Sequence, residues 1–267
     1  MHPILLRIGS VRIYSYGVLI ALGGLVSGRF WYVRRQRMGI AAEEDFWLLL
    51  NVILLGGFVG GRALYLIEYT RLFSADFWKT FFSLSRGYSV LGAFAGVLGG
   101  LWWFSRRVGA PLSRVLDYVC QAAPVWHAFG RLGCFAAGCC YGLPTSMPWG
   151  VTFTDPRAMI DPRLLGRPVH PTQLYEALGE LVIAALLYRF VLRAVEEGRQ
   201  PAGSVAAAYF VGYACLRFVV EFFRGDTVAL AWLGLTAAQG LCLLLAASAL
   251  AFHVHNRRNF KSPCTRS

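Results

Sequence analysis

The sequence predicts an all-α integral membrane protein with about seven transmembrane helices and a small head on the outer face. The 267 residues are 57% hydrophobic and only 15% charged, whereas a soluble domain of this size carries about 25% charged residues. The apolar residues also form seven runs close to the roughly 20 residues that a helix needs to cross a bilayer. We treat residues 1–267 as one transmembrane domain, in which the hydrophilic stretch 143–171 forms the head.

The predicted spans follow one another through short, mostly basic loops. They are Tyr14–Val33, Asp45–Glu68, Tyr88–Ser105, Val115–Phe135, Thr172–Leu192, Ala202–Phe223 and Val228–Phe252. The third contains Gly92, Gly96, Gly99 and Gly100, and glycines of this kind permit close contact between helices. The fourth contains Pro124, so we expect it to break and to line a cavity, since irregular backbone is tolerated at membrane depth only where protein or water covers it.

Basic residues indicate the orientation of the chain. Compact clusters follow the first, third and fifth spans and recur in the C-terminal tail, and such clusters favour the cytoplasmic side. The N-terminus is therefore expected outside and the C-terminus in the cytoplasm. Residues Met1–Ser10 lack a basic segment followed by an apolar one, so no removable signal peptide is expected. The net charge of +12 is scattered and forms no nucleic-acid-binding face.

Two arginines lie where charge is costly. Arg131 stands between Gly130 and Gly133 near the end of the fourth span, and a charge at the centre of a membrane helix costs about 2.5–3.5 kcal/mol on insertion scales. A guanidinium in a glycine-lined recess suits a phosphate. In the sixth span, Tyr213, Arg217 and Glu221 are spaced by four and share one helix face.

Arg217 has two interpretations. It forms either a self-neutralising pair with Glu221 or, together with Arg131, a binding site for one anion. Arg62 likewise could pair with Glu68 or reach lipid headgroups.

Four sequence blocks carry a resemblance to a known family. The segment GRLGCFAAGCCYG, which ends at Gly142, resembles the signature block of the bacterial phosphatidylglycerol–prolipoprotein diacylglyceryl transferases. HPTQLYE at His170–Glu176, RFVVEFFR at Arg217–Arg224 and LTAAQ at Leu235–Gln239 resemble further blocks of that family, in the same order. SYG at 15–17 and GGRALY at 60–65 add weaker matches.

The resemblance implies a multi-pass enzyme of the bacterial inner (cytoplasmic) membrane, with seven transmembrane helices and a small periplasmic head. It also implies a periplasmic N-terminus and a cytoplasmic C-terminus. Such enzymes move the diacylglyceryl group of phosphatidylglycerol to the lipobox cysteine in the signal peptide of a preprolipoprotein, forming a thioether and releasing glycerol phosphate. The implied partners are therefore phosphatidylglycerol, lipobox signal peptides and membrane lipids, with no cofactor and no nucleic acid.

The expected site follows from these blocks. Arg131 and Arg217 would stabilise charge that develops on the leaving phosphate. Tyr16 and Tyr213 could hydrogen-bond phosphate or glycerol hydroxyls, or could simply be interfacial tyrosines. The expected catalytic residues are Arg131, Arg217, His127 and Tyr16. The expected substrate-binding residues are Arg131, Arg217, Tyr213, Gly130, Gly133, Gly142, Glu221, Arg224, His170, Tyr175 and Arg62.

The sequence departs from the family pattern at the proposed base. Leu91, in GYSVLGAFAG, falls where many members have a histidine, and leucine accepts no proton. His127, four residues before Arg131, is a candidate substitute, and His170 is another, although its alternative role is to hold the junction between head and membrane. Glu176 and Glu221 are expected to orient arginines. A catalytically altered or inactive lipid-binding paralogue, and a lipid or anion transporter, remain alternatives.

Three of the seven cysteines cluster in the signature block. Cys134 replaces an asparagine found in many members, and Cys139 falls where a glutamate often stands. The spacing of Cys134, Cys139 and Cys140 is unlike common zinc sites, so we favour small apolar residues lining a cavity. A Cys134–Cys139 or Cys134–Cys140 disulfide is an alternative on an oxidising face. We expect no stoichiometric zinc and an active Cys139→Ser variant.

Overall fold

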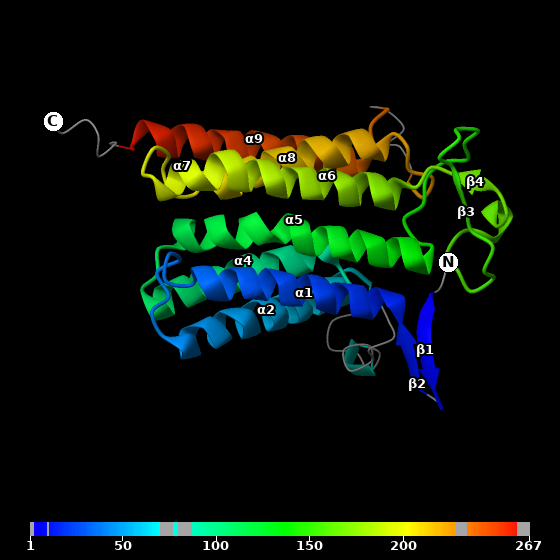
Figure 1. Cartoon of the computed structure of the whole chain (residues 1–267), viewed down its shortest axis with the longest axis horizontal. Helices are drawn as coiled ribbons and strands as arrows, with labels where there is room; N and C mark the ends of the chain where they lie inside the picture. The colour runs from blue at the N-terminus through cyan, green and yellow to red at the C-terminus, as the bar shows by residue number, and fades with distance from the viewer. Residues whose placement is uncertain (1–2, 10, 70–76, 80–86, 228–233, 261–267) are drawn as a thin grey trace. The chain divides into compact units, whose positions relative to one another are not determined.

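The computed structural model describes residues 3–9, 11–69, 77–79, 87–227 and 234–260 (Figure 1). The chain divides into two compact units, which we describe separately. One comprises Met1–Trp31 and Asp117–Ser267, and the other comprises Tyr32–Leu116. Four helices among the described residues are long and apolar enough to cross a membrane: α1 (Ser15–Arg34), α2 (Glu43–Tyr69), α8 (Ser204–Glu221) and α9 (Ala237–Arg258). The protein is therefore a largely helical membrane protein, and the count of seven spans stays a prediction.

The unit Tyr32–Leu116 is built on α2 and α4 (Val90–Val108), which pack through glycines. A Cβ atom at Gly92 or Gly96 would collide with the carbonyl oxygens of Gly60 and Gly56, respectively. Only glycine therefore allows the two backbones to approach this closely. The close contact expected of the third predicted span is confirmed at these two positions.

The larger unit contains α1, α5 (Leu112–Ala137), α6 (Thr172–Leu186), α8 and α9. Helices α1 and α5 are held together by indole groups that donate to carbonyls across the pair. The Trp31 Nε1 donates to the carbonyl of Tyr118 at 2.9 Å, and the Trp126 Nε1 donates to that of Ile20 at 3.0 Å. Each bond satisfies a polar group that would otherwise be buried without a partner.

Helix α6 continues through a π-helical turn, η2 (Leu187–Leu192), into α7 (Arg193–Glu196). The next helix, α8, begins at Ser204 because the buried carboxylate of Asp117, on α5, accepts hydrogen bonds from the backbone N–H groups of Gly203, Val205 and Ala206 at 2.7–3.0 Å. These are donors that the first turn of a helix leaves unpaired, and a negative charge is favourable at that end of the helix dipole.

Two expectations about the helices were wrong. Helix α5 is continuous through Pro124, whereas we expected a break. A proline removes one hydrogen bond, and a membrane helix can absorb that loss through its neighbours. Helix α9 begins at Ala237 rather than at Val228, because Thr236 and Gln239 form a capping box at its start. Residues 228–233 lie outside the described part of the chain.

Short strands complete the larger unit. Strands β1 (Ile4–Ile8) and β2 (Val11–Tyr14) form an antiparallel ribbon directly before α1. In the region expected as the head, β3 (Val151–Thr152) pairs with β4 (Pro168–Val169), and η1 (Pro162–Leu164) lies between them. The side chains of Phe153, Ile160 and Val169 form a small core of their own.

Candidate functional site

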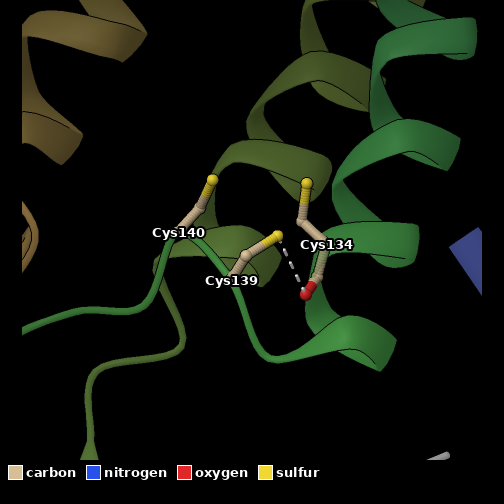
Figure 2. Close-up of side chains that lie close together, drawn as sticks. All are labelled: Cys134, Cys139 and Cys140. Atoms are coloured by element: carbon tan, nitrogen blue, oxygen red, sulfur yellow. Dashed lines mark hydrogen bonds between the residues drawn. The ribbon is translucent and has the colours of Figure 1, made fainter. Parts of the chain in front are cut away.

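The three cysteines of the signature block come together where α5 ends. The sulfur atoms of Cys134, Cys139 and Cys140 all lie within 4.8 Å of one another (Figure 2). The Cys139 thiol donates to the carbonyl of Cys134 at 3.8 Å, and all three cysteines are free thiols. Neither alternative disulfide is formed in the structure, and the three sulfurs lie close together. The expectation that these side chains line a cavity stays a prediction.

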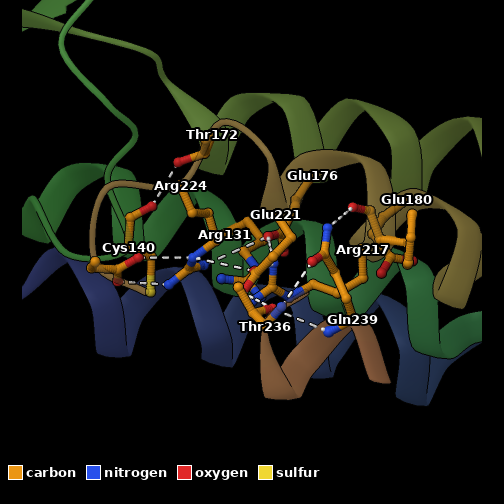
Figure 3. Close-up of polar contacts among 12 residues, drawn as sticks. Arg131, Cys140, Thr172, Glu176, Glu180, Arg217, Glu221, Arg224, Thr236 and Gln239 are labelled. Atoms are coloured by element: carbon orange, nitrogen blue, oxygen red, sulfur yellow. Dashed lines mark hydrogen bonds and ion pairs between the residues drawn. The ribbon is translucent and has the colours of Figure 1, made fainter. Parts of the chain in front are cut away.

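Three arginines of the site surround the carboxylate of Glu176, a residue with 1% of its surface exposed. Its Oε2 lies 2.5 Å from the Nε of Arg131, and its Oε1 lies 3.9 Å from Arg217 Nη1 and 3.7 Å from Arg224 Nη1 (Figure 3). Helix α6 thus places one carboxylate between an arginine from α5, one from α8 and one from the residues that follow α8. Arg131 and Arg217, which are 86 residues apart in sequence, meet there.

The acidic partners of the other two arginines are also local. Arg217 Nη1 forms an ion pair with Glu221 on its own helix, so the pairing and the convergence with Arg131 coexist. The Thr236 hydroxyl donates to the second Glu221 oxygen at 2.6 Å, which ties this pair to the start of α9. Arg224 donates to Asp226 through two bonds of 2.8 and 2.6 Å.

His127 uses both ring nitrogens within the protein. Its Nδ1 lies 2.6 Å from Oε1 of Glu180, which is completely buried, and its Nε2 lies 3.2 Å from the Nε of Arg131. Because arginine can only donate, Nε2 is the acceptor in that contact, and the ring proton then resides on Nδ1 facing Glu180. In this arrangement the lone pair that a general base needs is already directed at Arg131.

Tyr16 and Tyr213 both lie at this cluster. A Cβ atom at Gly133 would come within 2.8 Å of the Tyr16 ring, so the glycine makes room for that ring. At Gly130, in contrast, a Cβ atom would find nothing within 4 Å. The Tyr213 ring centroid lies 5.4 Å from that of His127.

Gly142, His170 and Tyr175 contact one another beside residues 143–171. The Gly142 N–H donates to the carbonyl of His170 at 3.0 Å, and a Cβ atom at Gly142 would meet both that carbonyl and the carbonyl of Phe223. His170 Nδ1 lies 3.0 Å from the Tyr175 hydroxyl, which also accepts a hydrogen bond from the Trp149 indole at 2.8 Å. His170 thus contacts Tyr175 on α6 and the backbone of Gly142, and its role at the junction stays a prediction.

Two of the expected residues belong to the other unit. Arg62 is buried there and donates to the carbonyl of Gly87 at 2.7 Å, and Leu91 is 55% exposed. Their roles in the reaction stay predictions.

Sequence reasoning missed Glu180 and Thr236. The spacing of Glu176 and Glu180 by four residues places them on one face of α6 and could have suggested that both carboxylates belong to the site.

Similarity to known proteins extends over most of the chain. The family model for prolipoprotein diacylglyceryl transferases matches residues 3–255. A phosphatidylglycerol–prolipoprotein diacylglyceryl transferase of Clostridium tetani is 33% identical over 85% of this chain and 86% of its own length. Proteins of the same name from Paracidovorax citrulli and Nitratidesulfovibrio vulgaris are 34% and 32% identical, over 97% and 100% of this chain and 96% and 98% of their own lengths. The chain belongs to the prolipoprotein diacylglyceryl transferase family.

Proposed function

We propose that this protein transfers the diacylglyceryl group of phosphatidylglycerol to the lipobox cysteine thiol of a preprolipoprotein, forming a thioether and releasing glycerol phosphate. The observation that carries the proposal is the meeting of Arg131, Arg217 and Arg224 around Glu176. Three guanidinium groups next to apolar, membrane-spanning helices suit a lipid whose headgroup is an anionic phosphodiester.

The arginines act on the charge that the reaction creates. The bond that breaks joins a glycerol carbon to a phosphate oxygen, so the leaving phosphate gains one negative charge in the transition state. Donors already aimed at that oxygen stabilise the transition state more than the ground state. Each arginine carries five N–H donors, so Arg131 and Arg217 keep donors for the phosphate while Glu176 and Glu221 hold them in place.

The remaining residues position these groups. His127, held by Glu180, fixes the side chain of Arg131, and Glu221, held by Thr236, fixes that of Arg217. Tyr16 and Tyr213 supply hydroxyls for the glycerol or the phosphate. Gly130, Gly133 and Gly142 shape the surface against which the substrate binds. The contact between His170 and Tyr175 anchors that surface to the head at residues 143–171. Arg62, in the unit Tyr32–Leu116, is the remaining residue to which we assign lipid binding.

The membrane arrangement belongs to the same proposal. The chain crosses the bacterial cytoplasmic membrane seven times, with the N-terminus and the head at residues 143–171 in the periplasm and the C-terminus in the cytoplasm. α4, α5 and the continuous helix from Thr172 to Glu196 supply the three spans besides the four apolar helices. Cysteine accessibility labelling from either side of the membrane tests this topology.

The function is tested with the purified protein in phosphatidylglycerol vesicles and a synthetic lipobox peptide. We expect the peptide to gain the mass of one diacylglyceryl group and glycerol phosphate to appear in equal amount. Phosphatidylethanolamine vesicles and a peptide with serine at the lipobox cysteine are the controls. Leu91 favours a second candidate, an inactive lipid-binding paralogue, and tight phosphatidylglycerol binding without any thioether would establish that protein instead.

A further inference from the structure

The backbone where α5 ends directs three thiols to one point. Gly138 takes the left-handed conformation, with φ of 80°, and its N–H donates to the carbonyl of Cys134 at 2.8 Å, so the chain reverses onto the last turn of the helix. Cys140 also has a positive φ of 59°, which is uncommon for a residue with a Cβ atom. This conformation turns the Cys140 side chain back toward its neighbours, although adjacent cysteines normally point apart.

Buried side chains of α6 hold this loop in place. The Thr172 hydroxyl donates to the carbonyl of Cys140, and the Gln173 amide donates to that of Cys139, both at 2.7 Å. Both α6 side chains are buried, with at most 1% of their surface exposed. A strained conformation that its surroundings enforce in this way is typical of functional sites.

Positive charge lies beside the cysteine cluster. The guanidinium groups of Arg131 and Arg224 lie close to the Cys140 side chain (Figure 3). Arg224 itself hydrogen-bonds Cys140. Both arginines are also paired with carboxylates, Arg131 with Glu176 and Arg224 with Asp226, and positive charge at this place would stabilise cysteines in the thiolate form.

We propose that Cys134, Cys139 and Cys140 bind one Zn²⁺ ion as thiolates and leave its fourth coordination position open for the lipobox cysteine of the substrate. The proposal rests on the proposed transferase function. Zinc–thiolate bonds of about 2.3 Å place sulfurs of a tetrahedral site about 3.8 Å apart, so small side-chain rotations suffice from the observed cluster. Catalytic zinc sites commonly have three protein ligands and one open position.

The zinc ion would replace the missing base. Leu91 accepts no proton, and the free lone pair of His127 faces Arg131. A thiol that coordinates zinc is deprotonated, so binding of the substrate cysteine would release its proton to water. The thiolate then attacks the glycerol carbon, the carbon–oxygen bond breaks, and the electron pair of that bond leaves with glycerol phosphate. The thioether product carries no charge, binds zinc weakly and departs.

The net charge of such a zinc site is opposite in sign to that of the neighbouring arginines. One Zn²⁺ and three thiolates sum to a single negative charge, which Arg131 and Arg224 can accept beside them. On the spacing of the cysteines alone we expected no stoichiometric zinc and an active Cys139→Ser variant, and the present proposal reverses both expectations. The spacing argued against a metal because adjacent cysteines chelate one ion awkwardly. The positive φ of Cys140 removes that objection.

Metal analysis of the full-length protein, purified under reducing conditions, tests the site without reference to activity. We expect about one zinc per chain, and loss of that zinc in Cys139→Ser and Cys140→Ser but not in the control Cys215→Ser, an exposed cysteine on α8. After exchange with Co²⁺, the thiolate-to-metal absorption should correspond to three thiolates. Adding the lipobox peptide without lipid should raise it to four, and a peptide with serine in that position should not.

The transfer assay then separates the two proposals. Chelation should abolish thioether formation in the wild-type protein, and added Zn²⁺ should restore it, which requires no variant to fold. A zinc-free protein that transfers at full rate would overturn the metal site and leave the transferase function intact. A disulfide among the three cysteines in the active protein would also overturn the metal site. A protein that holds zinc in the three cysteines yet forms no thioether would overturn the transferase function instead.

Discussion

Glu176→Gln is the most informative single change, because one buried carboxylate faces three arginines. Glutamine keeps the shape of the side chain but removes its charge, so three guanidinium groups lose a shared counterion. Removal of one partner from a buried ion pair costs about 3–5 kcal/mol, since the other charge is left uncompensated. We expect the free energy of unfolding to fall by about that amount and diacylglyceryl transfer to be lost.

Glu197→Gln is the matched control. Glu197 pairs with Arg199, and both side chains are more than half exposed, so its loss should cost at most about 1 kcal/mol. Denaturant unfolding in mixed micelles gives both values, and the peptide assay gives the rates. If the two variants were equally stable and equally active, Glu176 would not organise the site.

A double-mutant cycle provides a second test of the interaction between Arg131 and Glu176. Arg131→Gln together with Glu176→Gln removes both partners of the closest pair, so the double variant should lose less stability than the sum of the single variants. Strict additivity would mean that the two side chains do not interact energetically.

Four further predictions concern single residues. Arg217→Lys should lower the transfer rate by about 10²–10³-fold, because lysine lacks the planar fork, and activity near wild type would remove the phosphate role. His127→Ala should slow transfer by on the order of 100-fold through misplacement of Arg131 but leave the shape of the pH–rate profile unchanged, whereas loss of one limb of the profile would make His127 the base. Leu91→Ala should change the rate less than about tenfold, and an abolished reaction would show a direct role. Asp117→Asn should lower the free energy of unfolding by about 1.5–3 kcal/mol with lipid binding retained, and an unchanged unfolding curve would contradict its role at the start of α8.

The helices were largely predictable because their signals are local. The apolar run Tyr14–Val33 differs from α1 by one residue at each end, and the glycines of the third predicted span do lie against α2. Length, hydropathy and glycine spacing are properties of neighbouring residues. Pro124 misled the prediction, because a propensity to break a helix can be overridden by the packing around it.

The site was only half predictable, since its residues meet through tertiary structure. The arginines stood out because charge is rare in apolar segments. Glu176 pairs with Arg131, whereas Glu180 pairs with His127. Which carboxylate meets which partner depends on how α5 and α6 are rotated against each other, and the residue spacing in the sequence does not predict that rotation. The meeting of Cys139 with Cys140 depends on one positive φ angle in a non-glycine residue, for which the sequence carries no signal.

The balance of charges in the cluster explains how it can favour the transition state over the bound lipid. Arg131, Arg217 and Arg224 face Glu176, Glu221 and Asp226, so the charges of these six side chains balance. Arginines balanced in this way attract the single charge of the phosphodiester only moderately and do not hold the lipid too tightly. In the proposed reaction, the second charge appears on the leaving phosphate as the carbon–oxygen bond breaks, and the N–H donors that the carboxylates leave unused would stabilise it. In this proposal the carboxylates fix the arginines before the reaction, and the gain from that preorganisation is realised only as the leaving phosphate becomes charged.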